Sequence, residues 1–206
     1  MEKYVLDTNL FFNMEPGLGL GEKTNEVIES ATAGFLKLKK KSNSQFLMPP
    51  KVVKELKSFF DQEDLILKKF LAEITVKSPN ISQTSFPASL FYELVEEIKD
   101  RITRGLTVAE DELYKAVSSL APVELKNKQD IQMKTGLFTK SLRDRYRQLT
   151  RTRFLDSTAD LDLIVLAKEE DAYLISTDEG VIYWGRKFGV KEMDAEVFGK
   201  KISQSE

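Results

Sequence analysis

The 206-residue chain contains neither cysteine nor histidine. The absence of cysteine excludes disulfide bridges and thiol nucleophiles, and the absence of histidine excludes catalytic triads of the Ser-His-Asp type. Zinc sites built from imidazole or thiolate ligands are excluded as well. We therefore expect any chemistry in this protein to use carboxylates with a hard, oxygen-binding cation such as Mg²⁺.

Long apolar runs are also missing. No segment approaches the roughly 18 apolar residues that a membrane-spanning helix needs. The first residues lead directly into a predicted strand and show no signal peptide. These features predict a cytoplasmic protein that has no membrane association.

The charges are unevenly distributed, although the net charge is only −2. Residues 134–153 carry seven Lys/Arg and one Asp, whereas residues 154–206 carry twelve Asp/Glu and six Lys/Arg. A basic segment therefore precedes an acidic lobe, which makes the basic segment the candidate for contact with phosphates.

Short apolar runs that are typical of strands alternate with helical periodicity at both ends of the chain. Strands are predicted at residues 3–6, 46–48, 74–76, 173–175 and 190–193. Helices are predicted at residues 25–40, 50–60, 63–71, 157–170 and 179–188. This alternation predicts an α/β fold with a parallel β-sheet flanked by helices.

The middle of the chain has a different pattern. Apolar residues recur at helical spacing from residue 87 to about residue 119, and a second helical stretch covers residues 127–153. We therefore predict a helical hairpin, or arm, at residues 87–153. It is inserted into an α/β domain made of residues 1–86 and 154–206.

Four aspartates are the candidate catalytic residues. Asp7 and Asp178 each follow a predicted strand, while Asp156 and Asp160 lie at the start of a predicted helix. Sites in parallel sheets form beyond the carboxyl ends of the strands, so these carboxylates are predicted to converge there. Clustered carboxylates repel one another, and a divalent cation relieves that repulsion. The pattern favours metal-dependent phosphodiester hydrolysis, with Mg²⁺ as the expected ion and Mn²⁺ as the alternative.

Each aspartate also has a purely structural interpretation. Asp7 is compatible with a helix N-cap or a turn, and Asp156 with an N-cap. Asp178 is compatible with a solvated turn before Gly180. Only the combination of the four residues favours a site.

Several segments carry a resemblance to PIN-like nuclease domains. Residues 4–9 resemble the first strand of such a domain, and residues 48–56 resemble the segment that supplies a second acidic residue, here Glu55. Residues 160–167 and 173–178 resemble the two later acidic motifs. Four motifs in the correct order are more specific than any one of them.

Further segments resemble the small protein-only ribonuclease P family, over nearly the whole chain. These segments are residues 91–97, 101–106, 155–157 and 176–180. The resemblance implies an endoribonuclease that removes the 5′ leader of precursor tRNA. It assigns metal binding and catalysis to Asp7, Asp156, Asp160 and Asp178. It also implies a large homo-oligomer, up to a dodecamer, assembled through the helical arm.

Other residues receive supporting roles. Thr8, Glu55 and Asp162 are expected near the metal site, Glu55 as a possible ligand. Arg143, Arg147 and Arg151 recur every four residues on one helix face, which is the spacing either of a solvated face or of a phosphate-binding row. The resemblance favours the second interpretation, with these arginines at the elbow of the tRNA.

Two competing functions stay open at this point. One is a PIN-type ribonuclease of another kind, such as a toxin or an RNA-decay enzyme. The long insertion and the row of arginines disfavour a compact toxin. The other is a non-catalytic RNA-binding protein, for example a partner of an RNA ligase, which the complete set of aspartates disfavours.

Overall fold

The computed structural model describes residues 1–12, 18–61, 63–120, 128–151, 154–155 and 157–204. The chain divides into two compact units. The first comprises Met1–Phe86 and Leu155–Glu206, and the second comprises Pro87–Phe154. Within the described residues, none of the helices combines the length and the apolar character that crossing a membrane requires.

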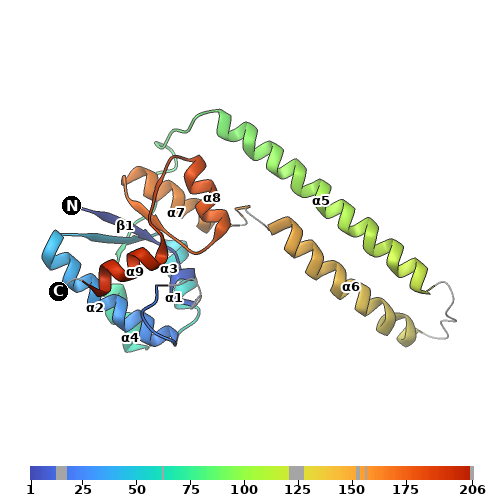
Figure 1. Cartoon of the computed structure of the whole chain (residues 1–206), viewed down its shortest axis with the longest axis horizontal. Helices are drawn as coiled ribbons and strands as arrows, with labels where there is room; N and C mark the ends of the chain where they lie inside the picture. Colours follow the sequence, from blue (N-terminus) through green and yellow to red (C-terminus); the bar gives the residue numbers. More distant parts are fainter. Residues whose placement is uncertain (13–17, 62, 121–127, 152–153, 156, 205–206) are drawn as a thin grey trace. The chain divides into compact units, whose positions relative to one another are not determined.

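The first unit contains a five-stranded parallel sheet in the order β3-β2-β1-β4-β5 (Figure 1). The strands are β1 (Lys3–Leu6), β2 (Gln45–Met48), β3 (Thr75–Val76), β4 (Tyr173–Ile175) and β5 (Lys191–Glu192). The chain builds outward from β1 to β3 and then returns to place β4 on the other side of β1. The predicted α/β class with a flanked parallel sheet is therefore confirmed.

Strand β1 forms the centre of the core. Tyr4, Val5 and Leu6 are fully buried, as expected for a strand that has neighbours on both sides and helices on both faces. The Tyr4 ring stacks on Phe46 of β2 with 5.6 Å between ring centroids, and Phe46 stacks on Phe35 at 3.9 Å. Tyr4 and Phe46 are also paired in the sheet, so these aromatic contacts on one face of the sheet support the register of β1 and β2.

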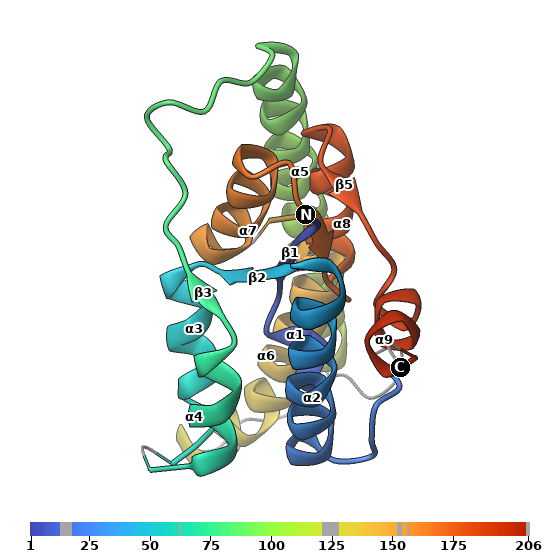
Figure 2. The ribbon, with the colours of Figure 1, turned by 90° about the vertical axis from the view of Figure 1, so that its left-hand side faces the viewer.

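Helices cover both faces of the sheet (Figure 2). Helices α2, α4 and α9 pack together on one face, while α7 and α8 pack together on the other. The helices of this unit are α1 (Asn9–Phe12), α2 (Thr24–Ser42), α3 (Pro50–Lys57), α4 (Leu65–Ala72), α7 (Thr158–Glu169), α8 (Glu179–Lys187) and α9 (Ala195–Ser203). This arrangement follows from right-handed crossovers, which switch faces when the chain reverses its direction across the sheet.

Some helix ends differ from the predicted ones. Helix α3 ends at Lys57 and not at Phe60, because the next residues turn with hydrogen bonds back to residues three positions earlier. The short α1 and the C-terminal α9 were not predicted. Gly189 ends α8, since it has a φ of +67° and its N–H donates to the carbonyl of Arg186.

Two glycines allow α9 to approach its neighbours closely. A Cβ atom on Gly199 would lie 1.8 Å from the carbonyl oxygen of Leu18, and one on Gly34 of α2 would lie 2.7 Å from the carbonyl oxygen of Ile202. Leu18 is buried, and it belongs to a glycine-rich segment of which the structure describes residues 18–22. Helix α9 therefore holds that segment against the core.

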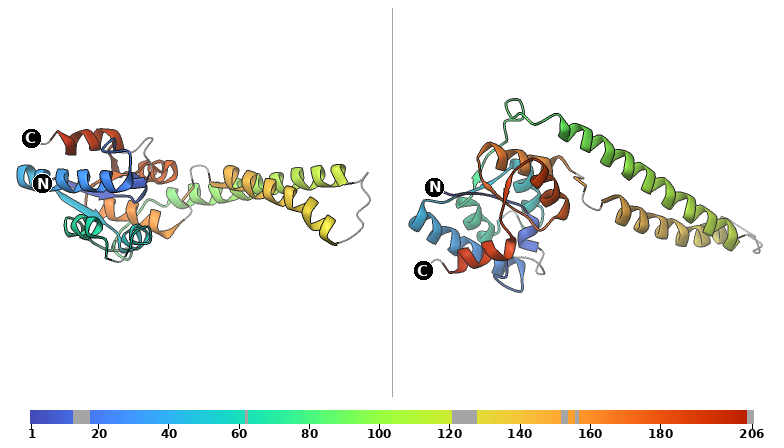
Figure 3. Two further views of the ribbon diagram at one scale, coloured as in Figure 1. Left: turned by 90° about the horizontal axis from the view of Figure 1, so that it is seen from below. Right: turned by 45° about the horizontal axis from the view of Figure 1, so that its top comes forward.

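The second unit is a helical hairpin formed by α5 (Ser89–Leu120) and α6 (Lys128–Arg151), which run side by side (Figure 3). Buried Glu112 accepts hydrogen bonds from Arg145 at 2.6 Å and from Lys115 at 2.8 Å. These two cations lower the pKa of Glu112 to about 2. The carboxylate of Glu112 therefore stays ionised as it links the two helices.

Further contacts confirm the antiparallel register of the hairpin. The Arg104 guanidinium donates to the carbonyl of Leu149 at 3.1 Å. The ring of Tyr146 fills the space beside Gly105, where a Cβ atom would come within 2.7 Å of the ring. Gly105 therefore serves helix packing and does not interrupt α5.

Candidate active site

The ends of β1 and β4 meet at the point where the strand order reverses. The N–H of Asp7 donates to the carbonyl of Ile175 at 3.1 Å, so the parallel pairing continues to the last residue of β4. Crevices at such switch points, beyond the carboxyl ends of the strands, are the usual ligand sites of open α/β sheets. The fold thus brings residue 7 next to residues 176–178, which are far away in the sequence.

Asp7 is the buried acid of this site, with only 5% of its surface exposed. Its Oδ2 accepts a hydrogen bond of 2.5 Å from the hydroxyl of Ser176 and one of 3.5 Å from the side-chain amide of Asn9. Its Oδ1 accepts a bond of 3.4 Å from the Asn9 backbone N–H. The carboxylate is therefore held by Asn9 of α1 and by Ser176, which directly follows β4.

Burial raises the pKa of Asp7 to about 6. The hydrogen bonds from Ser176 and Asn9 act in the opposite direction, whereas the negative charges of Asp160 and Asp178 raise the pKa further. This influence requires that both carboxylates lie near Asp7. The structure thus places Asp160 and Asp178 within electrostatic range of Asp7.

Asp160 and Asp178 are each fixed at the N-terminus of a helix. Asp178 is the N-cap of α8 and accepts hydrogen bonds at Oδ1 from the N–H groups of Gly180 at 2.7 Å and Val181 at 3.1 Å. Asp160 accepts a hydrogen bond of 3.0 Å from the Ser157 N–H and completes a capping box. The N-termini of two helices therefore hold these acids in place through backbone N–H groups.

The fourth predicted acid, Asp156, lies outside the described residues. Its structural alternative, the N-cap of the helix, falls instead to Ser157, whose hydroxyl accepts from the N–H groups of Ala159 and Asp160. Helix α7 begins at Thr158, so Asp160 lies in its first turn.

The three residues with predicted supporting roles differ in position. Thr8 is buried, and its hydroxyl donates to the carbonyl of Val52 at 3.3 Å, which ties the site to α3. Asp162 forms an ion pair of 2.9 Å with Lys51 at the start of α3. Glu55 is exposed on α3, without a described contact to Asp7.

The donors of this site suit a hard divalent cation, because Asp7, Asp160 and Asp178 offer only carboxylate oxygens. Burial and, to a smaller extent, the neighbouring acids raise the pKa of Asp7, and a bound cation would offset both effects. Among the described residues alone, however, no group of three acidic side chains has the arrangement of a metal site. These acids could hold a cation only as part of a larger set.

Three residues around the site, Ser176, Asn9 and Lys51, were not among the predicted site residues. Ser176 donates to Asp7 and accepts a hydrogen bond of 3.0 Å from the Asp178 N–H, so one hydroxyl orients two acids. Its position, two residues before Asp178 at the end of a strand, was the available signal. Hydroxyl and amide residues are too common at strand ends for that signal to suffice.

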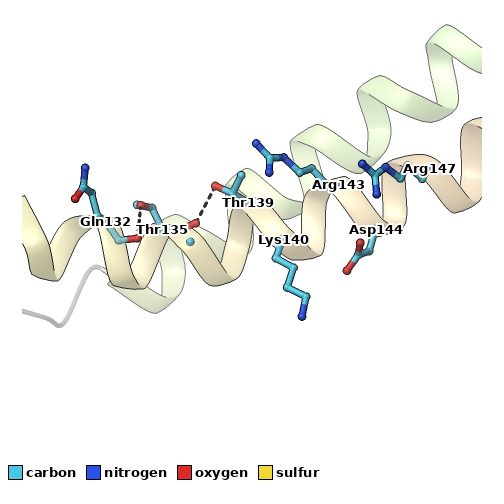
Figure 4. A pocket seen from close by; sticks show the side chains of 8 residues that line it. Gln132, Thr135, Thr139, Lys140, Arg143, Asp144 and Arg147 are labelled. Atoms are coloured by element: carbon cyan, nitrogen blue, oxygen red, sulfur yellow. Dashed lines mark hydrogen bonds between the residues drawn. The ribbon is translucent and has the colours of Figure 1, made fainter.

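The predicted row of arginines belongs to α6. The side chains of Arg143 and Arg147 are exposed and extend from the same side of the helix (Figure 4). Together with Lys140 and Asp144, both arginines line a shallow pocket of about 480 Å³. Neither arginine forms an ion pair with any described residue, and the side chain of Arg151 lies outside the described structure.

Comparisons with known proteins identify the family of this chain. The family model of PINc domain ribonucleases matches residues 3–205, so the fold and the site define a PIN-type ribonuclease. An RNA-free ribonuclease P of Thermodesulfovibrio yellowstonii is 38% identical over 95% of this chain and 91% of its own length. The RNA-free ribonuclease P of Thermococcus kodakarensis is 35% identical over 95% of this chain and 91% of its own length. That of Halorhodospira halophila is 35% identical over 93% of this chain and 84% of its own length. The chain belongs to the RNA-free ribonuclease P family.

The buried acid generates a prediction for stability. The pKa of Asp7 is about 6 in the folded protein, above its ordinary value of 3.8, so the folded state holds the proton more tightly. The contribution of Asp7 to the free energy of unfolding is therefore highest below pH 4 and falls as the pH rises through 6. The loss is roughly 3 kcal/mol, because each unit of pKa difference corresponds to about 1.4 kcal/mol. We expect Asp7→Asn to be more stable than the wild type at pH 8 in EDTA, and the difference to shrink toward pH 4.

Urea unfolding of both proteins at pH 4, 5, 6 and 8 measures this difference. The exposed Asp100→Asn serves as the control, because a solvated carboxylate has no such cost. If the difference in stability between Asp7→Asn and the wild type does not change with pH, the pKa of Asp7 is not raised in the folded protein.

Proposed function

We propose that this protein is a metal-dependent endoribonuclease that removes the 5′ leader of precursor tRNA without an RNA subunit. The observation that carries the proposal is the buried Asp7, which lies at the switch point of the sheet close to Asp160 and Asp178, in a chain of the RNA-free ribonuclease P family. A carboxylate is otherwise too costly at such a buried position, so its presence favours a catalytic role.

The proposed metal ligands are Asp7, Asp160, Asp178 and Asp156. Bound Mg²⁺, or Mn²⁺ in its place, supplies Lewis-acid chemistry that activates water and stabilises negative charge on the phosphate. Neighbouring residues of the protein hold the acids in position. Ser176 holds Asp7 and the backbone of Asp178 in place, while the N–H groups of Gly180 and Val181 orient the Asp178 carboxylate.

The two units have separate roles in this proposal. The first unit, the nuclease domain, carries the acids, and the second unit is an arm that contacts the tRNA. Arg143 and Arg147 support this role, because two exposed guanidinium groups on one face of α6 can follow a phosphate backbone. Arg151 continues the row in the sequence. Contact at a distance from the cut would select the substrate by its shape.

We also propose that the arm mediates assembly into a large homo-oligomer. Helix α5 exposes a row of apolar residues, namely Phe91, Val95, Ile98, Ile102, Leu106, Leu113 and Val117. Their spacing of three, four or seven residues places them along one stripe of the helix. An apolar stripe of this length is unusual on a monomer and is typical of a helix that packs against another chain.

Cleavage of precursor tRNA tests the proposed activity. We expect purified protein to release the leader of 5′-labelled precursor tRNA with Mg²⁺ and to lose this activity in EDTA. Asp7→Asn should reduce the rate by at least about 1,000-fold, whereas the exposed Asp100→Asn should not change it. Cleavage away from the mature 5′ end would instead indicate another PIN-type ribonuclease. Binding without cleavage by the wild type would indicate a non-catalytic RNA-binding protein.

The role of the arginine row is tested by the dependence of binding on salt. We expect Arg147→Ala to weaken precursor tRNA binding severalfold and to lower the slope of log K against log [salt] by about 1, because one phosphate contact is lost. Lys99→Ala is the control, since it removes the same charge from an exposed position on α5, outside this row. Equal effects of the two substitutions would show that only net charge matters.

Assembly through α5 is tested by changing one residue of the apolar stripe. Ile102 is 64% exposed, so Ile102→Glu is not expected to unfold the hairpin. It should reduce the mass measured by light scattering toward the 23.5 kDa of a single chain. The neighbouring exposed Thr103→Glu adds the same charge outside the stripe and should leave the mass unchanged. A monomeric wild type would refute the proposed oligomer.

A further inference from the structure

A groove of about 460 Å³ lies in the first unit and plays no part in the metal site. Its walls come from α1, from the start of α2 and from the segment between α3 and α4. We name it the aromatic groove, after the rings of Phe12, Phe59 and Phe60 that line it, together with Asn25, Asp61 and Asp64.

The aromatic groove begins one helical turn from the candidate active site. Helix α1 carries Asn9, whose amide donates to the Asp7 carboxylate, and Phe12, which lines the groove. Residues three positions apart share a helix face, with roughly 5–6 Å between their Cβ atoms. The hydroxyl of Thr8 anchors the start of α1 to the carbonyl of Val52 in α3. The groove and the acids are therefore held by the same short helix.

The rings form an exposed surface. Phe12 and Phe59 lie with 4.4 Å between their ring centroids, and Phe59 is 58% exposed. Backbone hydrogen bonds from Phe59 to Leu56 and from Phe60 to Lys57 end α3 and fix the position of both rings. An isolated exposed phenylalanine is common, but this pair borders a cavity next to a site that cleaves RNA. Rings in such a position provide a stacking surface for a base.

The charges of the aromatic groove indicate which part of a nucleotide it can accept. Asp61 and Asp64 line it, so a phosphate group would be repelled. Asp64 is engaged as the N-cap of α4, whereas the exposed Asp61 and Asn25 can hydrogen-bond with the amino and carbonyl groups of a base edge. The groove therefore suits an uncharged base stacked on a ring.

We infer that the aromatic groove stacks one unpaired nucleobase of the 5′ leader next to the scissile phosphate. This inference rests on the proposed function, and it adds a substrate contact that the acids do not supply. The base is assigned to the leader, because the leader is single-stranded and is joined directly to the scissile phosphate, whereas the bases of the acceptor stem are paired and stacked. Phe59 is the main contact, and Phe12 supports its ring.

Single-turnover cleavage of precursor tRNA tests the groove. Phe59→Ala should lower kcat/KM by roughly 5- to 100-fold, the range expected for the loss of one stacked base. Phe59→Tyr, which retains the ring, should keep most of the activity. Leu65→Ala is the matched control, since Leu65 is an apolar residue that is 69% exposed and does not line the groove. Thermal unfolding should be similar for all three variants because these positions are exposed.

An abasic nucleotide at each of the first three leader positions identifies the stacked base. At one position it should slow the wild type about as much as Phe59→Ala does, and it should cause little further loss in Phe59→Ala. Losses that multiply at every position, or a Phe59→Ala variant as active as the wild type, would overturn the inference.

Binding of RNA separates this inference from the proposed function. If the wild type does not cleave precursor tRNA, the proposed function fails, and a short single-stranded RNA that contains 2-aminopurine still reports on the groove. Stacking should quench its fluorescence with the wild type and with Phe59→Tyr, and much less with Phe59→Ala. Equal quenching by all three proteins, or none by the wild type, would reject the groove as a base-binding site.

Discussion

The pairing of β1 with β4 is the constraint on which the site depends. These strands lie about 170 residues apart in the chain, and the hydrogen bond from the Asp7 N–H to the Ile175 carbonyl extends their ladder to its last position. Because both strands run in the same direction, their carboxyl ends share one edge of the sheet. Ser176 can then reach Asp7 and Asp178 with a single hydroxyl. Without this pairing, the acids would belong to unrelated surface turns.

The site combines an unfavourable charge with local features that hold it in place. Burial and neighbouring acids raise the pKa of Asp7, whereas Ser176 and Asn9 partly offset this effect. Asp160 and Asp178 cap helices, so the interactions that stabilise α7 and α8 also position the acids. The structural interpretation of these residues and the catalytic one are therefore compatible. In Asp178, for example, both capping hydrogen bonds go to Oδ1, so the cap leaves Oδ2 available for another ligand.

Much of the fold followed from local patterns. The strands at Lys3–Leu6 and Tyr173–Ile175 were predicted with their observed bounds, because a buried parallel strand reads as a short continuous apolar run. Helix α1 was missed because four residues cannot show helical periodicity, and α9 because its apolar face is interrupted by Gly199. The early end of α3 was missed because Phe59 and Phe60 look like a continuation of its apolar face. The turn beyond Lys57 exposes Phe59 instead.

The sequence alone determined which chemistry was available. Without histidine or cysteine, only carboxylates could bind a metal ion, and their place after apolar runs indicated the carboxyl edge of a sheet. Only the tertiary structure decided which hydroxyl and amide groups serve those carboxylates. It also decided that Phe59 lies beside Phe12 and that Arg145 pairs with Glu112. Such contacts join segments that lie far apart in the chain, and their geometry depends on helix packing and strand order, which no local pattern specifies.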